Sequence, residues 1–295
     1  MNTFRFSSLL IAAGLATGAF AQIDPSNDTR PALQGDPAGL VQSTAAEDGG
    51  DYSKLVVARY VVDYRAFVLN DFEFQTNADL SGDAGEHSFV WLPTVGATAN
   101  VKFNSPFSIE ATAALQAAFY ADVSNLDFWG VDAVANLNYE ISPSWTVYAG
   151  PEVYNYQSLD GGGELSSGVA PTAGVRHTHV INSRTTLFAG ARYQHHFVSP
   201  SSSERDVWSG DVGFVRQFTS TCFGRGFYEY RYSDYLNAGG RQDWRNTVGV
   251  SGIYVPSKGL RISTGVTFST NDSTESAAEF RALNIGIGSA LTWDF

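Results

Sequence analysis

The sequence predicts an all-β fold, a transmembrane antiparallel up-and-down β-barrel of about twelve strands, from three observations. From Lys54 onward, apolar and polar residues alternate in stretches of about 12 to 17 residues, the period of a strand with two unlike faces. The polar breaks between these stretches are alternately short and long, as in barrels with tight turns at one rim and loops at the other. Beyond the N-terminal apolar run, no window approaches the roughly 18 to 20 uninterrupted apolar residues of a membrane helix.

The N-terminal region has the features of export rather than of the fold. Arg5 precedes an apolar run over 9–19, and Ala19-Phe20-Ala21 fits the A-x-A pattern of a signal-peptide cleavage site. The segment that follows is rich in Asp, Gly, Pro, Ser and Ala, and has too few large apolar groups to offset its ordering entropy. The expected division is a signal peptide over 1–21, a disordered arm over 22–53 and a barrel over 54–295.

Twelve alternating stretches follow one another along the barrel region. We expect strands near 55–69, 88–103, 106–122, 129–141, 144–156, 165–181, 184–198, 206–219, 222–234, 243–256, 259–271 and 280–295. The long breaks are 70–87, 123–128, 157–164, 199–205, 235–242 and 272–279, and an even strand number places both chain ends at the short-turn rim. Ten or fourteen strands also fit the pattern. Because proline removes a ladder hydrogen bond, a bulge is expected near Pro151 and Pro171.

The alternation assigns a lipid-facing and a lumen-facing side to each strand. In 106–122, Phe107, Ile109 and Leu115 alternate with Ser108 and Glu110, so the odd positions are expected to face lipid. Aromatic residues gather near the strand ends, where barrels have interfacial girdles. On the short-turn side these are Phe103, Phe107, Trp145, Phe218, Tyr254 and Trp293, and on the opposite side Trp91, Phe119, Trp129, Trp208 and Phe280.

The closing strand connects this pattern to a known class of protein. Its odd positions include Leu291, Trp293 and Phe295, whereas its even positions are small or polar, among them Asn284 and Gly286. It resembles the terminal β-signal of Gram-negative outer-membrane β-barrels, and the strand number is similar to that of small porin-like channels. The resemblance implies an outer-membrane location with both termini periplasmic, contact with outer-membrane lipid, and recognition of Leu291, Trp293 and Phe295 by the barrel-assembly machinery.

Composition argues against several functions. The chain has 18 Lys+Arg against 30 Asp+Glu, a net charge of −12, so a nucleic-acid partner is not expected. The single Cys222 cannot form an intrachain disulfide. His177 and His179 are too far from His195 and His196 along paired strands to share a metal, so interfacial or loop histidines are expected and neither metal nor cofactor is predicted. No Ser–His pair with an orienting residue is evident, so we predict no enzyme.

The inward charges suggest a function for the lumen. Counted from the short turns, six charged residues fall at similar mid-barrel depth and form a predicted constriction: Asp63, Asp132, Glu152, Arg192, Glu229 and Arg231. Opposed carboxylates and guanidiniums would set up a transverse field that orders water and selects polar solutes. We therefore expect a narrow diffusion channel for small hydrophilic solutes. Two alternatives remain: a barrel plugged by its own side chains, and a non-conducting structural or adhesive barrel whose loops 70–87 and 272–279 bind a partner.

Overall fold

The computed structural model describes residues 60–77, 87–103, 105–161 and 163–295. The predicted signal peptide, the arm and the first six residues of the predicted barrel region lie outside these ranges. The described residues form one closed antiparallel barrel of twelve strands, which confirms the predicted fold class. The strands are β1 (Tyr60–Gln75), β2 (Ser88–Phe103), β3 (Phe107–Tyr120), β4 (Phe128–Ser142), β5 (Trp145–Ser158), β6 (Glu164–Asn182), β7 (Thr185–Ser199), β8 (Arg205–Gln217), β9 (Cys222–Tyr235), β10 (Gln242–Ser257), β11 (Leu260–Ser273) and β12 (Phe280–Asp294).

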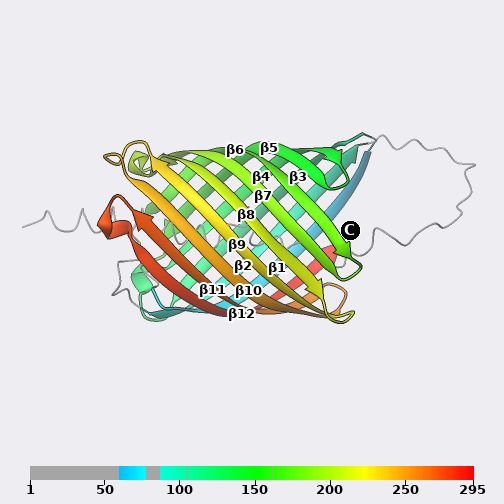
Figure 1. Cartoon of the computed structure of the whole chain (residues 1–295). Helices are drawn as coiled ribbons and strands as arrows, with labels where there is room; N and C mark the ends of the chain where they lie inside the picture. Colours follow the sequence, from blue (N-terminus) through cyan, green and yellow to red (C-terminus); the bar gives the residue numbers. More distant parts are fainter. Residues whose placement is uncertain (1–59, 78–86, 104, 162) are drawn as a thin grey trace, which may run out of the picture.

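Each strand pairs with the next in sequence, and β12 closes the barrel against β1 (Figure 1). The closing register runs from Arg65 opposite Asp294 to Gln75 opposite Asn284. The C-terminus lies at the end of the barrel that has the tight turns (Figure 1). Connections at the other end contain the short 3-10 helices η2 (Ser124–Leu126), η3 (Ser201–Ser203) and η4 (Ser276–Ala278). No helix in the described part of the chain is long and apolar enough to cross a membrane.

The first strand extends six residues further along the chain than the sequence predicts. The alternation predicts this strand over 55–69, but the structure continues it through Gln75, and residues 70–75 pair with both β2 and β12. The cause is that the alternation persists into this polar stretch, with Phe72 and Phe74 outward and Asp71 and Glu73 inward. The first six residues of the predicted break at 70–87 are therefore strand, and the polar residues among them belong to the barrel wall.

The prolines do not push their hairpin out of the barrel, so the expected bulge is wrong. Pro151 of β5 lies opposite Pro171 of β6 within a continuous pairing register. Pairing with the outer neighbours is interrupted instead, since β4–β5 pairing passes from Glu152 to Ala149 and β6–β7 pairing from Val169 to Thr172. The missing proline N–H groups thus lie at short gaps in the ladders toward β4 and β7.

The outer surface is apolar and carries aromatic residues near both rims, as the alternation predicts. Exposed aromatic residues near the tight-turn end are Phe103, Phe107, Trp145, Phe218, Tyr254 and Trp293, and those near the other end are Trp91, Phe119, Trp129 and Trp208. The prediction that Phe280 belongs to the girdle is wrong, because its side chain is buried inside the barrel. There the Arg245 guanidinium lies over its ring. It shares the inward parity of Ala282 and Asn284 on the same strand.

The lumen is filled unequally around its circumference. Near the long-connection end, a buried apolar cluster occupies the side formed by β2 to β5, and it comprises Val90, Leu92, Ala118, Tyr120, Val123, Phe128, Tyr154 and Tyr156. Val123 belongs to the β3–β4 connection, which folds inward, and the Asp127 carboxylate anchors this connection by accepting a hydrogen bond from the Tyr120 N–H at 2.6 Å. Burial raises the pKa of Asp127 despite that hydrogen bond. Because the apolar cluster and the inward-folded connection fill the β2–β5 side of the lumen, the open polar space lies on the opposite side.

Candidate functional site

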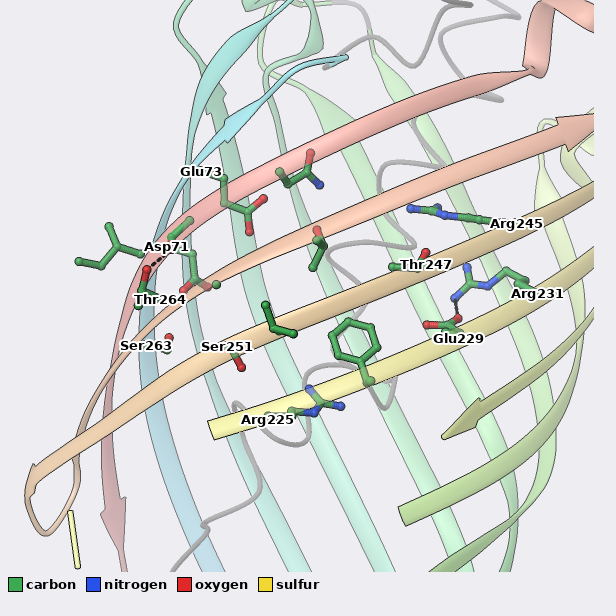
Figure 2. A pocket seen from close by; sticks show the side chains of 18 residues that line it. Asp71, Glu73, Arg225, Glu229, Arg231, Arg245, Thr247, Ser251, Ser263 and Thr264 are labelled. Carbon is green, nitrogen blue, oxygen red and sulfur yellow. Dashed lines mark hydrogen bonds and ion pairs between the residues drawn. The ribbon is translucent and has the colours of Figure 1, made fainter. Parts of the chain in front are cut away.

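A polar cavity lies in the lumen against β9, β10, β11, β12 and β1 (Figure 2). Alternation directs odd residues of β1, β9, β10 and β11 and even residues of β12 inward, so these five strands supply its wall. Most of the inward positions on the three middle strands are small or polar, which leaves the space open. They are Thr247, Ser251, Ser263, Gly265, Thr267, Asn284, Gly286 and Gly288.

Two carboxylates line the β1 side of the cavity. Asp71 lies opposite Gly288 and Glu73 opposite Gly286 in the closing register. A Cβ added at Gly288 would collide with the Asp71 carboxylate, and one added at Gly286 would lie 3.0 Å from Glu73 Cγ. The glycines of β12 therefore provide the room that both acidic side chains occupy beside the cavity.

Three guanidiniums line the opposite side, on β9 and β10 (Figure 2). Aromatic rings hold two of them, since Arg225 Cζ lies 5.1 Å from the Phe188 ring centroid and 4.8 Å from that of Phe227. Arg245 Cζ lies 5.5 Å from the Phe280 centroid. The third, Arg231, donates to Glu229 Oε1 at 2.9 Å. Cation–π contacts and this ion pair fix the positive groups toward one side of the lumen.

Among the six residues of the predicted constriction, Glu229 and Arg231 line this cavity together. Asp132, Glu152 and Arg192 are also buried inside the barrel, but on β4, β5 and β7, away from the cavity wall. There Glu152 Oε2 accepts a hydrogen bond from Gln194 Nε2 at 3.0 Å, and Arg192 Nε donates to Ser209 Oγ at 3.3 Å. The structure thus separates the predicted set into a cavity pair and a packed polar group.

The mid-barrel position predicted for Asp63 is wrong. It lies opposite Asn100 near the tight-turn rim, and its carboxylate contacts Lys102 Nζ at 3.2 Å with both side chains more than half exposed. The cause is the position of β1, since a strand that continues through Gln75 places the buried Phe67 and Leu69 near its middle and leaves Asp63 toward the tight-turn rim. Asp71 and Glu73 lie inside the lumen further toward the long-connection end. Sequence reasoning missed these two acids because they fall in an apparent loop, although the flanking Phe72 and Phe74 extend the alternation.

The histidines only partly follow the prediction. His177, His179 and His195 occupy the outward parity of their strands, and His195 Nδ1 lies 2.7 Å from Asp206 Oδ1 near the long-connection rim. His196 instead is buried in the lumen, where its Nδ1 lies 3.3 Å from the Tyr154 hydroxyl, because it shares the inward parity of Arg192 and Gln194. Within the described ranges, no group of three or more His, Cys, Asp or Glu residues is placed to hold a metal ion.

Fold and lumen together define a closed twelve-stranded barrel with an apolar outer surface and a polar cavity inside it. No protein-family model matches the chain, and no curated protein matches its sequence. Among solved structures, it is similar to the COG4313 outer membrane channel from Pseudomonas putida F1, with 9% identity, a TM-score of 0.59, and coverage of 84% of this chain and 100% of that chain.

Two solved porins are also similar, at lower structural agreement. The NanC porin has 10% identity and a TM-score of 0.47, covering 76% of this chain and 98% of that chain. The KdgM porin in complex with disordered oligogalacturonate has 13% identity and a TM-score of 0.44, with the same two coverages of 76% and 98%. At these identities the similarity concerns the fold alone, and of the three only the Pseudomonas channel exceeds a TM-score of 0.5. The chain has the fold of outer-membrane channel barrels.

Proposed function

We propose that this protein is a narrow, porin-like diffusion channel of the outer membrane for small hydrophilic solutes, without enzymatic activity. The observation that carries the proposal is the polar cavity inside the barrel, which is lined by charges of both signs on β1, β9 and β10. A charged side chain inside the lumen loses its hydration at a large free-energy cost unless water or a solute reaches it. A charged cavity inside a lipid-facing barrel therefore favours passage of polar molecules. The apolar outer surface and the aromatic residues near both rims support contact with outer-membrane lipid.

Within this proposal, the constriction is formed by Asp71, Glu73, Arg225, Glu229, Arg231 and Arg245. The packed group with Asp132, Glu152 and Arg192 narrows the lumen from the other side and keeps the passage on the β9–β1 wall. The tight turns and both ends of the described chain face the periplasm, as in bacterial barrels with short periplasmic turns.

Conductance tests the channel directly. Purified, refolded barrel in a planar bilayer should give small, discrete current steps, because the passage is confined to part of the lumen. A folded barrel that gives no steps would overturn the proposal. It would favour the second candidate function, a non-conducting structural or adhesive barrel, which the packed apolar cluster inside the long-connection end supports.

The same recordings identify the conducting wall. A double substitution Arg225→Ser with Arg231→Ser should shift ion selectivity toward cations, because it leaves the carboxylates of the cavity in excess. Arg184→Ser is the matched control, since Arg184 lies exposed in the β6–β7 turn and should leave selectivity unchanged. Unchanged selectivity in the double variant would show that ions do not pass these guanidiniums.

We also propose that Leu291, Trp293 and Phe295 form the recognition signal for the barrel-assembly machinery. Leu291 and Trp293 face outward, and the Phe295 N–H donates to the Tyr64 carbonyl at 2.9 Å, so the C-terminal residue takes part in barrel closure. Deleting Phe295 should reduce the amount of heat-modifiable, folded barrel in outer membranes several-fold. Spontaneous refolding of the same variant in detergent should be much less affected; equal losses in both assays would assign Phe295 a folding role instead.

A further inference from the structure

Charge in the cavity is balanced in number but separated in space. Its described lining contains three carboxylates, of Asp71, Glu73 and Glu229, and three guanidiniums, of Arg225, Arg231 and Arg245. Glu229 is paired with its neighbour Arg231, whereas the two acids of β1 are separated from the guanidiniums by the small and polar residues of β11 and β12 (Figure 2). One side of the passage is therefore negative and the other positive, with no net formal charge.

Such a cavity distinguishes solutes by their charge distribution. A cation is attracted by the carboxylates on the β1 side but repelled by the arginines. An anion is attracted by the arginines but repelled by the carboxylates. A solute with one ammonium and one carboxylate gains at both ends when it aligns with the field. The gain is larger than in bulk water because the walls have a low dielectric constant. Guanidinium forks also match a carboxylate geometrically, and carboxylates accept N–H donors of an ammonium.

The separation of the two sides sets the length of the solute. Glu73 and Arg225 lie on one row of the register, through β12, β11 and β10, so four strand spacings, about 19 Å along the wall, separate their backbone positions. Arg231 and Arg245 lie further along their strands, on the row of Phe280. Side chains project inward from both sides and shorten the gap. An extended chain spans roughly 3.5 Å per residue, so the two ends of a dipeptide or tripeptide lie about 7 to 10 Å apart. Short peptides thus fit the gap better than single α-amino acids do.

From these observations we propose that the channel selects zwitterionic solutes, short peptides in particular, over neutral or singly charged solutes of the same size. This inference rests on the proposed channel function and names its solute class. Asp71 and Glu73 act on the ammonium end, and Arg225, Arg231 and Arg245 act on the carboxylate end.

The test compares four solutes of nearly equal size in proteoliposomes that contain the full barrel. Glycylglycine is the zwitterion, N-acetylglycine the anion, glycylglycinamide the cation and N-acetylglycinamide the neutral member. Isotope-labelled solute is supplied at trace concentration and constant ionic strength, and initial uptake rates are measured against protein-free vesicles. Glycylglycine is expected to enter several-fold faster than each of the other three.

Variants assign the preference to the two sides. Asp71→Asn with Glu73→Gln should abolish the advantage of glycylglycine and make N-acetylglycine the fastest solute. Asp63→Asn is the matched control, because that carboxylate lies exposed at the rim and should leave the order unchanged. N-acetylglycinamide uptake, together with heat-modifiable migration, reports whether each variant is folded and open. Arg231→Gln with Arg245→Gln should instead favour glycylglycinamide.

The outcomes separate the two proposals. If no solute enters above the protein-free rate, the channel function itself fails. If all four enter the wild-type vesicles at equal rates, or if any solute other than glycylglycine is fastest, the channel stands and the zwitterion preference is overturned. If glycylglycine is preferred but the Asp71/Glu73 variant keeps the preference, the assignment to this cavity is overturned.

Discussion

Replacing Val250 by Arg is expected to destabilise the folded barrel in a bilayer by about 2 to 4 kcal/mol, the cost of a cation on the lipid face near the membrane midplane. Val250 lies in the middle of β10, and its side chain is 60% exposed on the outer surface. No water or counter-charge reaches that position when lipid covers it. The measurement is equilibrium urea unfolding of the barrel reconstituted in lipid vesicles.

Ser251 supplies the matched control for this prediction. It is the next residue on β10, so its side chain points into the lumen and lines the polar cavity. Ser251→Arg should cost clearly less stability than Val250→Arg, because its guanidinium reaches the polar lumen, although Arg225 lies directly opposite on β9. It should also lower conductance, since the guanidinium enters the passage. If both variants lose the same stability, the outer face of β10 does not contact lipid.

This pair of neighbours also shows why so much of the fold could be predicted. The face on which Val250 or Ser251 lies follows from a period of two, and that period is a local property of the chain. A polar or charged side chain on the lipid face destabilises the barrel, so the alternation is kept along each strand. The same parity places Phe280 and His196 inside the barrel, whereas their residue types alone favour an interfacial position.

The charged site was harder to predict because it depends on contacts that are distant in sequence. Asp71 and Glu73 become lumen residues only because β1 extends through Gln75 and pairs with Gly288 and Gly286 of β12. Nothing local distinguishes that polar stretch from a loop. Counting from the turns also ignores which side chains meet across the lumen, so it groups Asp63 and Asp132 with the cavity pair of Glu229 and Arg231.

The second large effect is expected on the opposite side of the lumen, where Leu92→Ala should cost about 2 to 5 kcal/mol, the usual range for a buried leucine. Leu92 is 1% exposed and belongs to the apolar cluster near the long-connection end. Truncation removes its contacts and leaves a cavity that close-packed neighbours fill only in part. Urea unfolding in vesicles again gives the free energy.

Val95→Ala is the control on the same strand, because Val95 is 49% exposed on the outer face and lipid can occupy the vacated volume. Its expected cost in unfolding free energy is therefore well below that of Leu92→Ala.

Conductance of the Leu92→Ala barrel gives a second result that a purely structural assay would miss. If the apolar cluster is closely packed, Leu92→Ala should lower stability while the passage along β9–β1 keeps its ion selectivity. A variant that keeps its stability but conducts more would show that the cluster closes the lumen loosely. Solutes could then pass on the β2–β5 side as well, and the charges of Asp71, Glu73 and the three arginines would no longer control selection alone.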